Sequence, residues 1–281
     1  MTEKVTFYIP AFNAEKTIEL SINSILNQTY PVDELIIIDD KSTDKTVELV
    51  KKFPDVKIIK NEKNLGLGFN RNLGIKNSSN EIVASIDSDV ELDTRWLETI
   101  IINLGKNNIV MCGGNMIEKY KNKKINAWRE KYYSQNWGKV DMKNPQFLYG
   151  CNTILLKNSW LKTNGYDENL KTNGEDIDFS NEIRKIQDAN LFYSSNSHCY
   201  HLQDDNIDTL STRVWRYHSF GYKIKEPSAK KFINLSIKQM RFFIIRFLKG
   251  LIDFDINDII ISFKVFINFV KHEYNLFKKN K

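Results

Sequence analysis

Long apolar segments, closely spaced cysteines and a nucleic-acid motif are all missing from this 281-residue sequence. No uninterrupted apolar run reaches the ~18 residues of a membrane-spanning helix, so we expect none. The three cysteines are far apart and odd in number, which argues against a disulfide framework or a cysteine metal site and fits a reducing, cytoplasmic compartment. Because the N-terminus enters a strand-like run at once, we also expect no signal peptide.

The positive charge is concentrated in one part of the chain. Of the net +6, residues 223–281 contribute +8, from 13 Lys/Arg and 5 Asp/Glu, which leaves −2 for the rest. No base-contacting motif accompanies this basic segment, so we expect no nucleic-acid partner. A basic tail facing anionic lipid fits better, and it suggests a location at the cytoplasmic face of a membrane.

Strand-like and helix-like segments alternate through the first third of the chain. Apolar, β-branched runs predict strands over residues 5–9, 34–38, 56–59 and 82–86. Pro10 is expected to end the first strand. Helical patterns follow over 15–27, after the capping residues Ser42-Thr43-Asp44, and over 66–76. The alternation predicts an α/β fold with a parallel, doubly wound sheet.

Two carboxylates follow the apolar run Ile82–Ile86, in the triplet Asp87-Ser88-Asp89. A buried strand would deliver both acids to its carboxyl end, where open α/β sheets bind ligands. Two carboxylates there can hold a hard divalent cation, and the cation can hold a diphosphate. The triplet alone is a weak signal. The segment Gly66–Arg71 is not the G-x-G-x-x-G of dinucleotide-binding folds, which disfavours that class.

Four motifs in succession resemble those of family 2 glycosyltransferases: Pro10–Asn13, Ile38–Asp44, Asn64–Gly74 and Asp87–Asp89. Their order and spacing match as well as their residues. The resemblance implies a GT-A fold, which is a Rossmann-like mixed sheet flanked by helices, a nucleotide-diphosphate sugar as substrate, and Mn²⁺ or Mg²⁺ as cofactor. Lys41 departs from the glycine that is usual in the family, and we expect a local change in that turn.

The resemblance also implies roles for the matching residues. The nucleotide pocket would be lined by Pro10, Ala11, Phe12 and Asn13. The base would be read by Asp40, with Asp39 as a second candidate. The ribose and phosphates would be bordered by Asn64, Gly66, Arg71, Asp87 and Ser88. The metal would be held by Asp89, with Asp87. Two alternatives stay open: the acid pair could serve a helix dipole, and Arg71 could form a surface ion pair.

The second half of the chain repeats the resemblance at Gly165–Glu168 and at Gly174–Phe179. In the family, such a turn is followed by a helix whose first residues include the catalytic carboxylate. An incoming hydroxyl must lose its proton as the glycosidic bond forms, and a carboxylate can accept it. We therefore assign Asp176 as the general base and Glu175 as a residue that either contacts the acceptor or supports the base from behind. The alternative is that both acids only complement the helix dipole.

Other features of this half are less specific. Strands are expected over 108–116 and 191–193, a strand pair over 147–156, and a helix over 94–104. His201 is a candidate metal ligand by its position after the base. Trp128, Tyr132, Tyr133 and Trp137 could contact an acceptor sugar, although packing is the commoner role at helical spacing.

We divide the chain into a catalytic domain over 1–222, with a donor half (1–105) and an acceptor half (106–222), and a helical tail over 223–281. In the tail, apolar residues from Ile237 to Leu251 share one helical face and basic residues lie opposite. This pattern fits a helix lying in a membrane interface, or one packed on the catalytic domain or on another subunit.

The resemblance implies an inverting, metal-dependent transferase that moves one sugar to a hydroxyl acceptor, such as a lipid-linked or cell-surface glycan precursor. UDP-sugars are the commonest donors in the family. Two alternatives are a non-catalytic nucleotide-sugar-binding or scaffold subunit and a sugar-phosphate nucleotidyltransferase. The second would need a glycine-rich basic N-terminal loop, which Pro10–Asn13 is not.

Overall fold

The computed structural model describes residues 3–219 and 229–279. Its chain forms two compact units. Unit 1 comprises residues 1–119, 135–171 and 175–202, and unit 2 comprises 120–134, 172–174 and 203–281. The predicted boundary at residue 222 lies outside the described residues.

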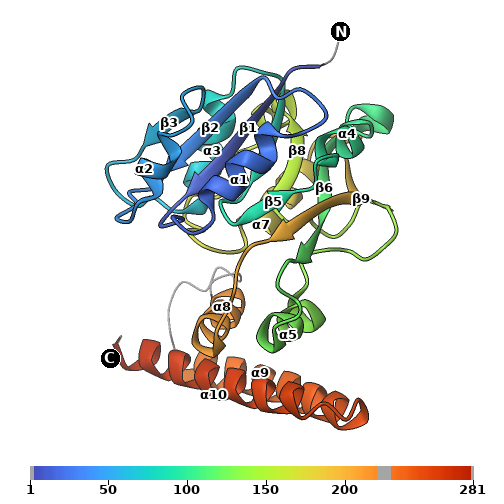
Figure 1. Ribbon diagram of the computed structural model, residues 1–281. Coiled ribbons are helices and arrows are strands. Elements are labelled where there is room, and N and C mark those ends of the chain that lie inside the picture. The colour runs from blue at the N-terminus through green and yellow to red at the C-terminus, as the bar shows by residue number, and fades with distance from the viewer. Residues whose placement is uncertain (1–2, 220–228, 280–281) are drawn as a thin grey trace. The chain divides into compact units, whose positions relative to one another are not determined.

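Unit 1 is built on one mixed β-sheet with the strand order β3-β2-β1-β4-β8-β6-β9-β5 (Figure 1). The strands are β1 Val5–Ala11, β2 Glu34–Asp39, β3 Lys57–Lys60, β4 Ile82–Ile86, β5 Val90–Leu92, β6 Ile109–Glu118, β7 Met142–Lys143, β8 Asn152–Leu156 and β9 Asn190–His201. The first four run parallel, β8 is antiparallel to both β4 and β6, and β9 is parallel to β6. The expected parallel sheet therefore holds for the donor half, and the whole is a mixed sheet.

Helices cover both faces of this sheet (Figure 1). They are α1 Ile18–Leu26, α2 Thr46–Val50, α3 Leu67–Asn77, α4 Trp96–Ile101, α6 Lys157–Leu161 and α7 Glu175–Arg184. Alternate residues of β1 enter two different cores: Phe7 packs with α1 and α4, whereas Tyr8 packs with α3 and α7. This alternation follows from the two-residue period of a strand.

Two local expectations were wrong. β1 continues through Pro10, because beyond Tyr8 only β2 still pairs with it and a missing N–H is tolerated there. The expected strand pair over 147–156 is one strand that begins at Asn152. The preceding Gly150 makes side-chain hydrogen bonds through both its N–H and its carbonyl oxygen, so neither group is available to a strand ladder.

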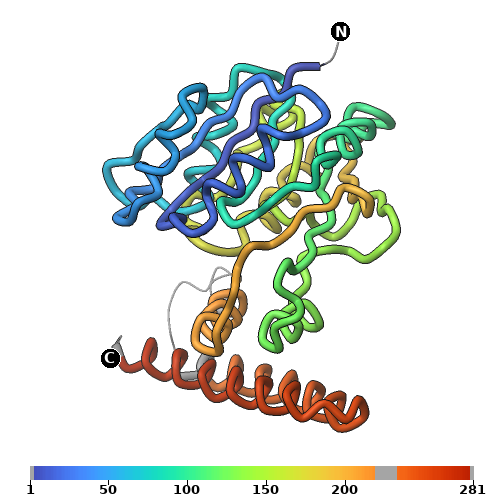
Figure 2. The backbone as a smooth tube through the Cα atoms, viewed as in Figure 1, coloured from blue at the N-terminus to red at the C-terminus, as the bar shows by residue number. Residues whose placement is uncertain are grey.

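Unit 2 is helical and contains α5 Lys124–Tyr133, α8 Ile207–Ser219, α9 Ala229–Ile252 and α10 Ile256–Lys279. The last two helices form a hairpin whose turn lies at residues 253–255 (Figure 2). Residues of α5, α8, α9 and α10 share one hydrophobic core, centred on Val265 and Phe269. Within the described residues, no helix combines the length and the apolar character needed to cross a membrane.

Candidate active site

The acidic triplet lies in the turn between β4 and β5, and backbone hydrogen bonds hold it on several sides. The Asp87 N–H donates to the Cys151 carbonyl at 3.1 Å, and the Asp89 carbonyl accepts from the Leu202 N–H at 2.8 Å. The Ser88 carbonyl accepts from the Ser21 hydroxyl at 2.9 Å. The triplet is thus fixed to β9 and to the segment before β8, which lie far away in sequence.

His201 lies beside this triplet because of strand register. It pairs with Val90 of β5 on one side and with Glu118 of β6 on the other. Its Nε2 is 3.5 Å from Asp89 Oδ2, and its Nδ1 is 3.1 Å from Glu118 Oε1. Burial lowers the pKa of His201, but its hydrogen bonds to Asp89 and Glu118 outweigh burial and leave the pKa raised.

The pairing of Asp89 with His201 is compatible with a divalent cation. A protonated imidazole between two carboxylates occupies a position of high negative charge, and a cation bound by Asp89 Oδ2 and His201 Nε2 would take that proton's place. Within residues 3–219 and 229–279, no three His, Cys, Asp or Glu side chains form a metal site by themselves. Oxygens of a bound diphosphate would have to complete the coordination, as is usual for Mg²⁺.

Arg71 is the centre of the site's charge network and is only 1% exposed. Its Nη2 is 2.9 Å from Asp87 Oδ1, and its Nε is 3.4 Å from Glu175 Oε1. Its Nη1 also donates to the Ser85 hydroxyl and to the Gly150 carbonyl, at 2.6 and 2.7 Å. The alternative of a surface ion pair is therefore wrong. Burial lowers the pKa of Arg71, but the two carboxylates outweigh it and raise the pKa well above its usual value.

Gly150 is a glycine because the guanidinium packs directly on its backbone. A Cβ at this position would lie 3.0 Å from Arg71 Cζ, which is closer than almost all real contacts. The residue therefore permits the close approach on which the Arg71 network depends.

The acids at the start of α7 lie at the same network. Glu175 is 3% exposed, and its Oε2 has no partner among the described residues. Burial raises its pKa, and the neighbouring charge of Asp176 adds to this. The Asp176 carboxylate accepts from the N–H of Ile177 at 2.8 Å and of Gly150 at 3.4 Å. Burial raises the pKa of Asp176 as well.

The two acids at the end of β2, Asp39 and Asp40, are buried and make different contacts. Both oxygens of Asp40 are used: Oδ1 accepts from the Leu65 N–H at 2.8 Å and Oδ2 from the Gly66 N–H at 2.9 Å. Asn64 also donates to the Asp40 carbonyl. Asp39 Oδ1 accepts from the Ser42 N–H at 3.2 Å. Asp40 thus ties down the loop before α3, where Gly66 has a φ of 89°.

The loop after β1 stands next to the β2 loop. Asn13 accepts from the Thr43 N–H at 2.8 Å and donates its own N–H to the Ser42 hydroxyl. Pro10 and Ala11 are buried, whereas the Phe12 ring is 51% exposed. Lys41 has a φ of 67°, so the turn keeps the left-handed conformation that glycine adopts easily.

The sequence prediction missed three residues that take part in the site. Glu118, Ser85 and Gly150 belong to no recognisable sequence motif. Their positions in the site follow from strand register and from the way the Arg71 side chain is buried there. Among the predicted aromatics, Trp128 is buried in unit 2, and the guanidinium of Arg246 lies 5.0 Å from its ring centroid. Packing is therefore the role that the structure supports for Trp128.

A family model described as "Glycosyl transferase family 2" matches residues 6–162 of the chain. The UDP-Glc:α-D-GlcNAc-diphosphoundecaprenol β-1,3-glucosyltransferase of Escherichia coli is 40% identical over 113 residues, which are 40% of this chain and 45% of the relative. The poly-β-1,6-N-acetyl-D-glucosamine synthase of Staphylococcus epidermidis is 30% identical over 233 residues, which are 79% of this chain and 55% of the relative. The chain therefore spans about half the length of these relatives.

Solved structures give the same fold. Residues 1–349 of S. aureus TarS match 99% of this chain and 92% of that chain, with a TM-score of 0.60 at 19% identity. A mannosyltransferase from Pyrobaculum calidifontis, in complex with GDP-Man and Mn²⁺, matches 82% of this chain and 66% of that chain, with a TM-score of 0.60 at 16% identity. The fold is thus the GT-A fold with additional C-terminal helices.

Proposed function

The chain belongs to glycosyl transferase family 2, and from this premise we propose that it moves one sugar from a nucleotide-diphosphate sugar to a hydroxyl acceptor. The observation that carries the proposal is the buried Arg71, which bonds both to Asp87 of the acidic triplet and to Glu175 beside Asp176. The Arg71 side chain thereby links the acidic triplet, which is the candidate site for metal and diphosphate, to the helix start that contains the candidate base. A scaffold subunit would not need this arrangement.

In this proposal the residues act in four groups. The loops at Pro10–Asn13 and Asn64–Gly66 enclose the nucleotide. Asp39 accepts a hydrogen bond from the base, because both carboxylate oxygens of Asp40 already accept from the Leu65 and Gly66 N–H groups. Asp89 and His201 would hold Mn²⁺ or Mg²⁺, and Asp87 and Ser88 would lie beside the ribose.

Asp176 removes the proton from the acceptor hydroxyl as that oxygen attacks the anomeric carbon, which inverts the configuration. A divalent cation held by Asp89 and His201 would supply positive charge opposite the leaving diphosphate. Glu175 and Arg71 do not touch the reacting atoms in this scheme. They fix the position of the loop at Gly150, whose N–H donates to Asp176.

For the acceptor we propose a lipid-linked glycan precursor at the cytoplasmic face of a membrane. Support comes from the E. coli relative, whose name specifies a diphosphoundecaprenol-linked sugar. UDP-sugars are the first donors to test, followed by GDP- and dTDP-sugars, because the structural neighbours include complexes with UDP and with GDP-Man.

The activity is testable by release of nucleoside diphosphate. We expect release from one nucleotide sugar in the presence of Mn²⁺ or Mg²⁺ and a lipid-linked acceptor, loss of release after treatment with EDTA, and recovery when metal is added back. Donor binding by calorimetry with no turnover on any acceptor would instead favour the scaffold alternative. Full activity in EDTA would contradict the metal assignment.

Glu118 is expected to position His201 for the cation. Glu118→Gln removes the negative charge that faces Nδ1, so the affinity for Mn²⁺ in the presence of nucleoside diphosphate should fall by about 10- to 100-fold. Electron paramagnetic resonance of free Mn²⁺ measures this without turnover. Glu91→Gln is the matched control, because Glu91 lies on the neighbouring β5 and pairs with Lys119 instead. Equal Mn²⁺ affinity in Glu118→Gln and wild type would contradict the role assigned to Glu118.

A further inference from the structure

The C-terminal hairpin has a second apolar face that no described residue of unit 2 covers. On α9 its residues recur every three or four positions, and the same holds for α10. We define the outer face by the half-exposed side chains Ile237, Met240, Ile244, Leu248 and Leu251 of α9 and Ile256, Ile260, Phe263 and Ile267 of α10, which are 42–62% exposed. An exposed stripe of this length on both helices is unusual for a monomeric soluble protein.

The opposite, inner face already accounts for the folding of the hairpin. Val265 and Phe269 are fully buried in the core of unit 2. Arg246 of α9 is 7% exposed and lies near the rings of Trp128 and of other aromatic residues. These contacts do not involve the outer face. The folding of the hairpin therefore does not explain why the outer face is apolar.

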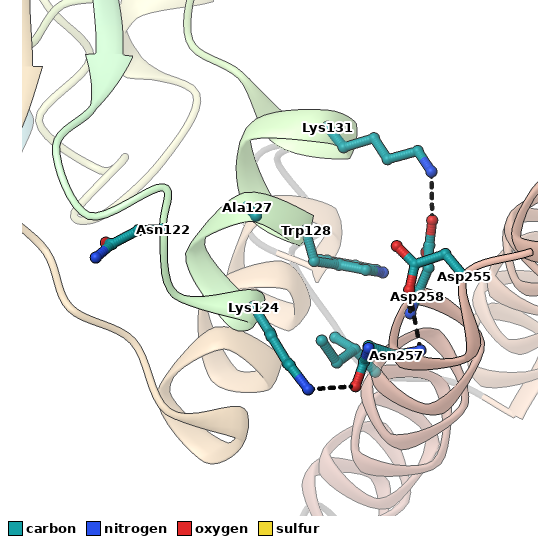
Figure 3. Close-up of a pocket in the computed structure, with 9 residues that line it drawn as sticks. Asn122, Lys124, Ala127, Trp128, Lys131, Asp255, Asn257 and Asp258 are labelled. Atoms are coloured by element: carbon teal, nitrogen blue, oxygen red, sulfur yellow. Dashed lines mark hydrogen bonds and ion pairs between the residues drawn. The ribbon is translucent and has the colours of Figure 1, made fainter. Parts of the chain in front are cut away.

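Polar contacts fix the same orientation around a cavity of about 210 Å³ between α5 and the start of α10 (Figure 3). Lys124 donates to Asn257 at 3.0 Å, and Lys131 pairs with Asp258. The Trp128 indole N–H donates to Ser262 at 2.9 Å. The charged groups lining this cavity are thus engaged with one another, and they anchor the inner face.

The turn of the hairpin is also apolar. Phe254 is 96% exposed and Ile252 is 75% exposed. Two acids flank Phe254, but Asp253 pairs with Lys131, and Asp255 accepts the N–H groups of Asn257 and Asp258. The turn therefore exposes the aromatic ring of Phe254, and the acids on either side of it already have partners within unit 2.

The exposed charges along the two helices have one sign. Helix α9 contains no Asp or Glu, and the two acids of α10, Asp258 and Glu273, are only 3% and 4% exposed. The exposed charged residues on the described parts of the helices are Arg241, Lys249, Lys264, Lys271 and Lys278. A second copy of this face would bring like charges together, whereas a surface of anionic headgroups would meet them with opposite charge.

We propose that the outer face of the hairpin binds an anionic lipid bilayer, with both helices lying in the interface and Phe254 inserted at the tip. Helices with an apolar face bordered by basic residues bind membranes in this way, without spanning them. The inference does not depend on the proposed sugar transfer, because vesicle binding requires no turnover.

The test uses the full chain and vesicles of phosphatidylcholine, alone or mixed with phosphatidylglycerol. We expect co-flotation with the mixed vesicles that weakens with added salt. Ile244→Glu with Leu248→Glu should reduce the bound fraction at least tenfold. Val140→Glu with Leu161→Glu is the matched control, since both side chains are exposed apolar residues of unit 1, and it should float like wild type. Far-ultraviolet circular dichroism checks that each variant is folded.

Three results would overturn the proposal: wild type that stays unbound, binding that is unchanged in the outer-face variant, or equal loss in the control. Self-association of wild type that the outer-face variant abolishes, in the absence of vesicle binding, would assign the face to a second copy instead. Nucleoside diphosphate release is measured separately on the same protein preparations, with a lipid-linked acceptor dissolved in detergent. Turnover without vesicle binding contradicts only this inference, and vesicle binding without turnover contradicts only the catalytic proposal.

Discussion

Replacing Asp176 with asparagine is expected to lower the turnover number by about 10²- to 10⁴-fold, the usual contribution of a general base. The amide keeps the size of the side chain but cannot accept the proton of the acceptor hydroxyl. The dissociation constant of the nucleotide sugar should stay close to that of wild type, because Asp176 is assigned to the acceptor. Single-turnover kinetics and calorimetry separate these two quantities.

Asp178→Asn is the control for Asp176→Asn. Both acids lie in the first turn of α7, so both carboxylates would interact favourably with the helix dipole, to a similar and small extent. If the two variants lose activity equally, the dipole explanation is correct and the base assignment is wrong.

The pH dependence provides a second check on the same variant. Burial raises the pKa of Asp176, and only the ionised carboxylate can act as a base. Activity should therefore rise with pH through a midpoint above 3.8, the ordinary value for the group. The residual activity of Asp176→Asn should not show this rise with pH.

Replacing Arg71 with methionine is expected to lower the free energy of unfolding by about 3–5 kcal/mol at neutral pH, which is typical when one partner of a buried ion pair is removed. Asp87 would lose its cationic partner, Glu175 would lose its hydrogen-bond donor, and the Ser85 and Gly150 oxygens would lose theirs. Asp87 should contribute less, because its side chain is 26% exposed. Urea titration followed by circular dichroism measures the change.

The loss in Arg71→Met should grow as the pH rises above about 8, the pKa of Glu175 in the folded protein. The pKa of Glu175 is already raised in the folded protein, and removal of the guanidinium raises it further. A carboxyl whose folded pKa exceeds its unfolded value of 4.5 destabilises the fold at higher pH and ceases to do so once it is protonated in both states. At neutral pH this carboxyl is protonated in both folded proteins and adds no difference between them. Above about pH 8 wild type ionises Glu175 beside Arg71 whereas the variant keeps it protonated, so the deficit widens there.

Arg95→Met is the control for Arg71→Met. Arg95 pairs with Glu98 on the surface, where their side chains are 66% and 48% exposed. Such a pair contributes less than about 1 kcal/mol. If both arginine variants were equally stable, Arg71 would not have the central position described for it.

The donor half of unit 1 was predictable because its signals are local. Each parallel strand is a short apolar run, and each is followed directly by the loop that carries its polar residues. Asp87 and Asp89 could therefore be placed at the end of β4 from the sequence alone.

The environment of His201 was not predictable, because it depends on pairings between distant strands. Glu118 faces His201 through the β6–β9 register, which contains two irregularities, and Val90 faces it from β5. A shift of one residue in either ladder would turn these side chains to the opposite face of the sheet. No periodicity within β6 or β9 reports such a register.

The Arg71 network also has a consequence for the order of folding. Its partners are 14, 79 and 104 positions away along the chain, at Ser85, Gly150 and Glu175. Contacts of such high sequence separation are slow to form, because loop closure precedes any stabilisation. During synthesis, the guanidinium can pair with Asp87 of the donor half, but the network stays incomplete until α7 supplies Glu175. The donor half is therefore a distinct region in sequence, but it reaches its final packing only when the acceptor half has been made.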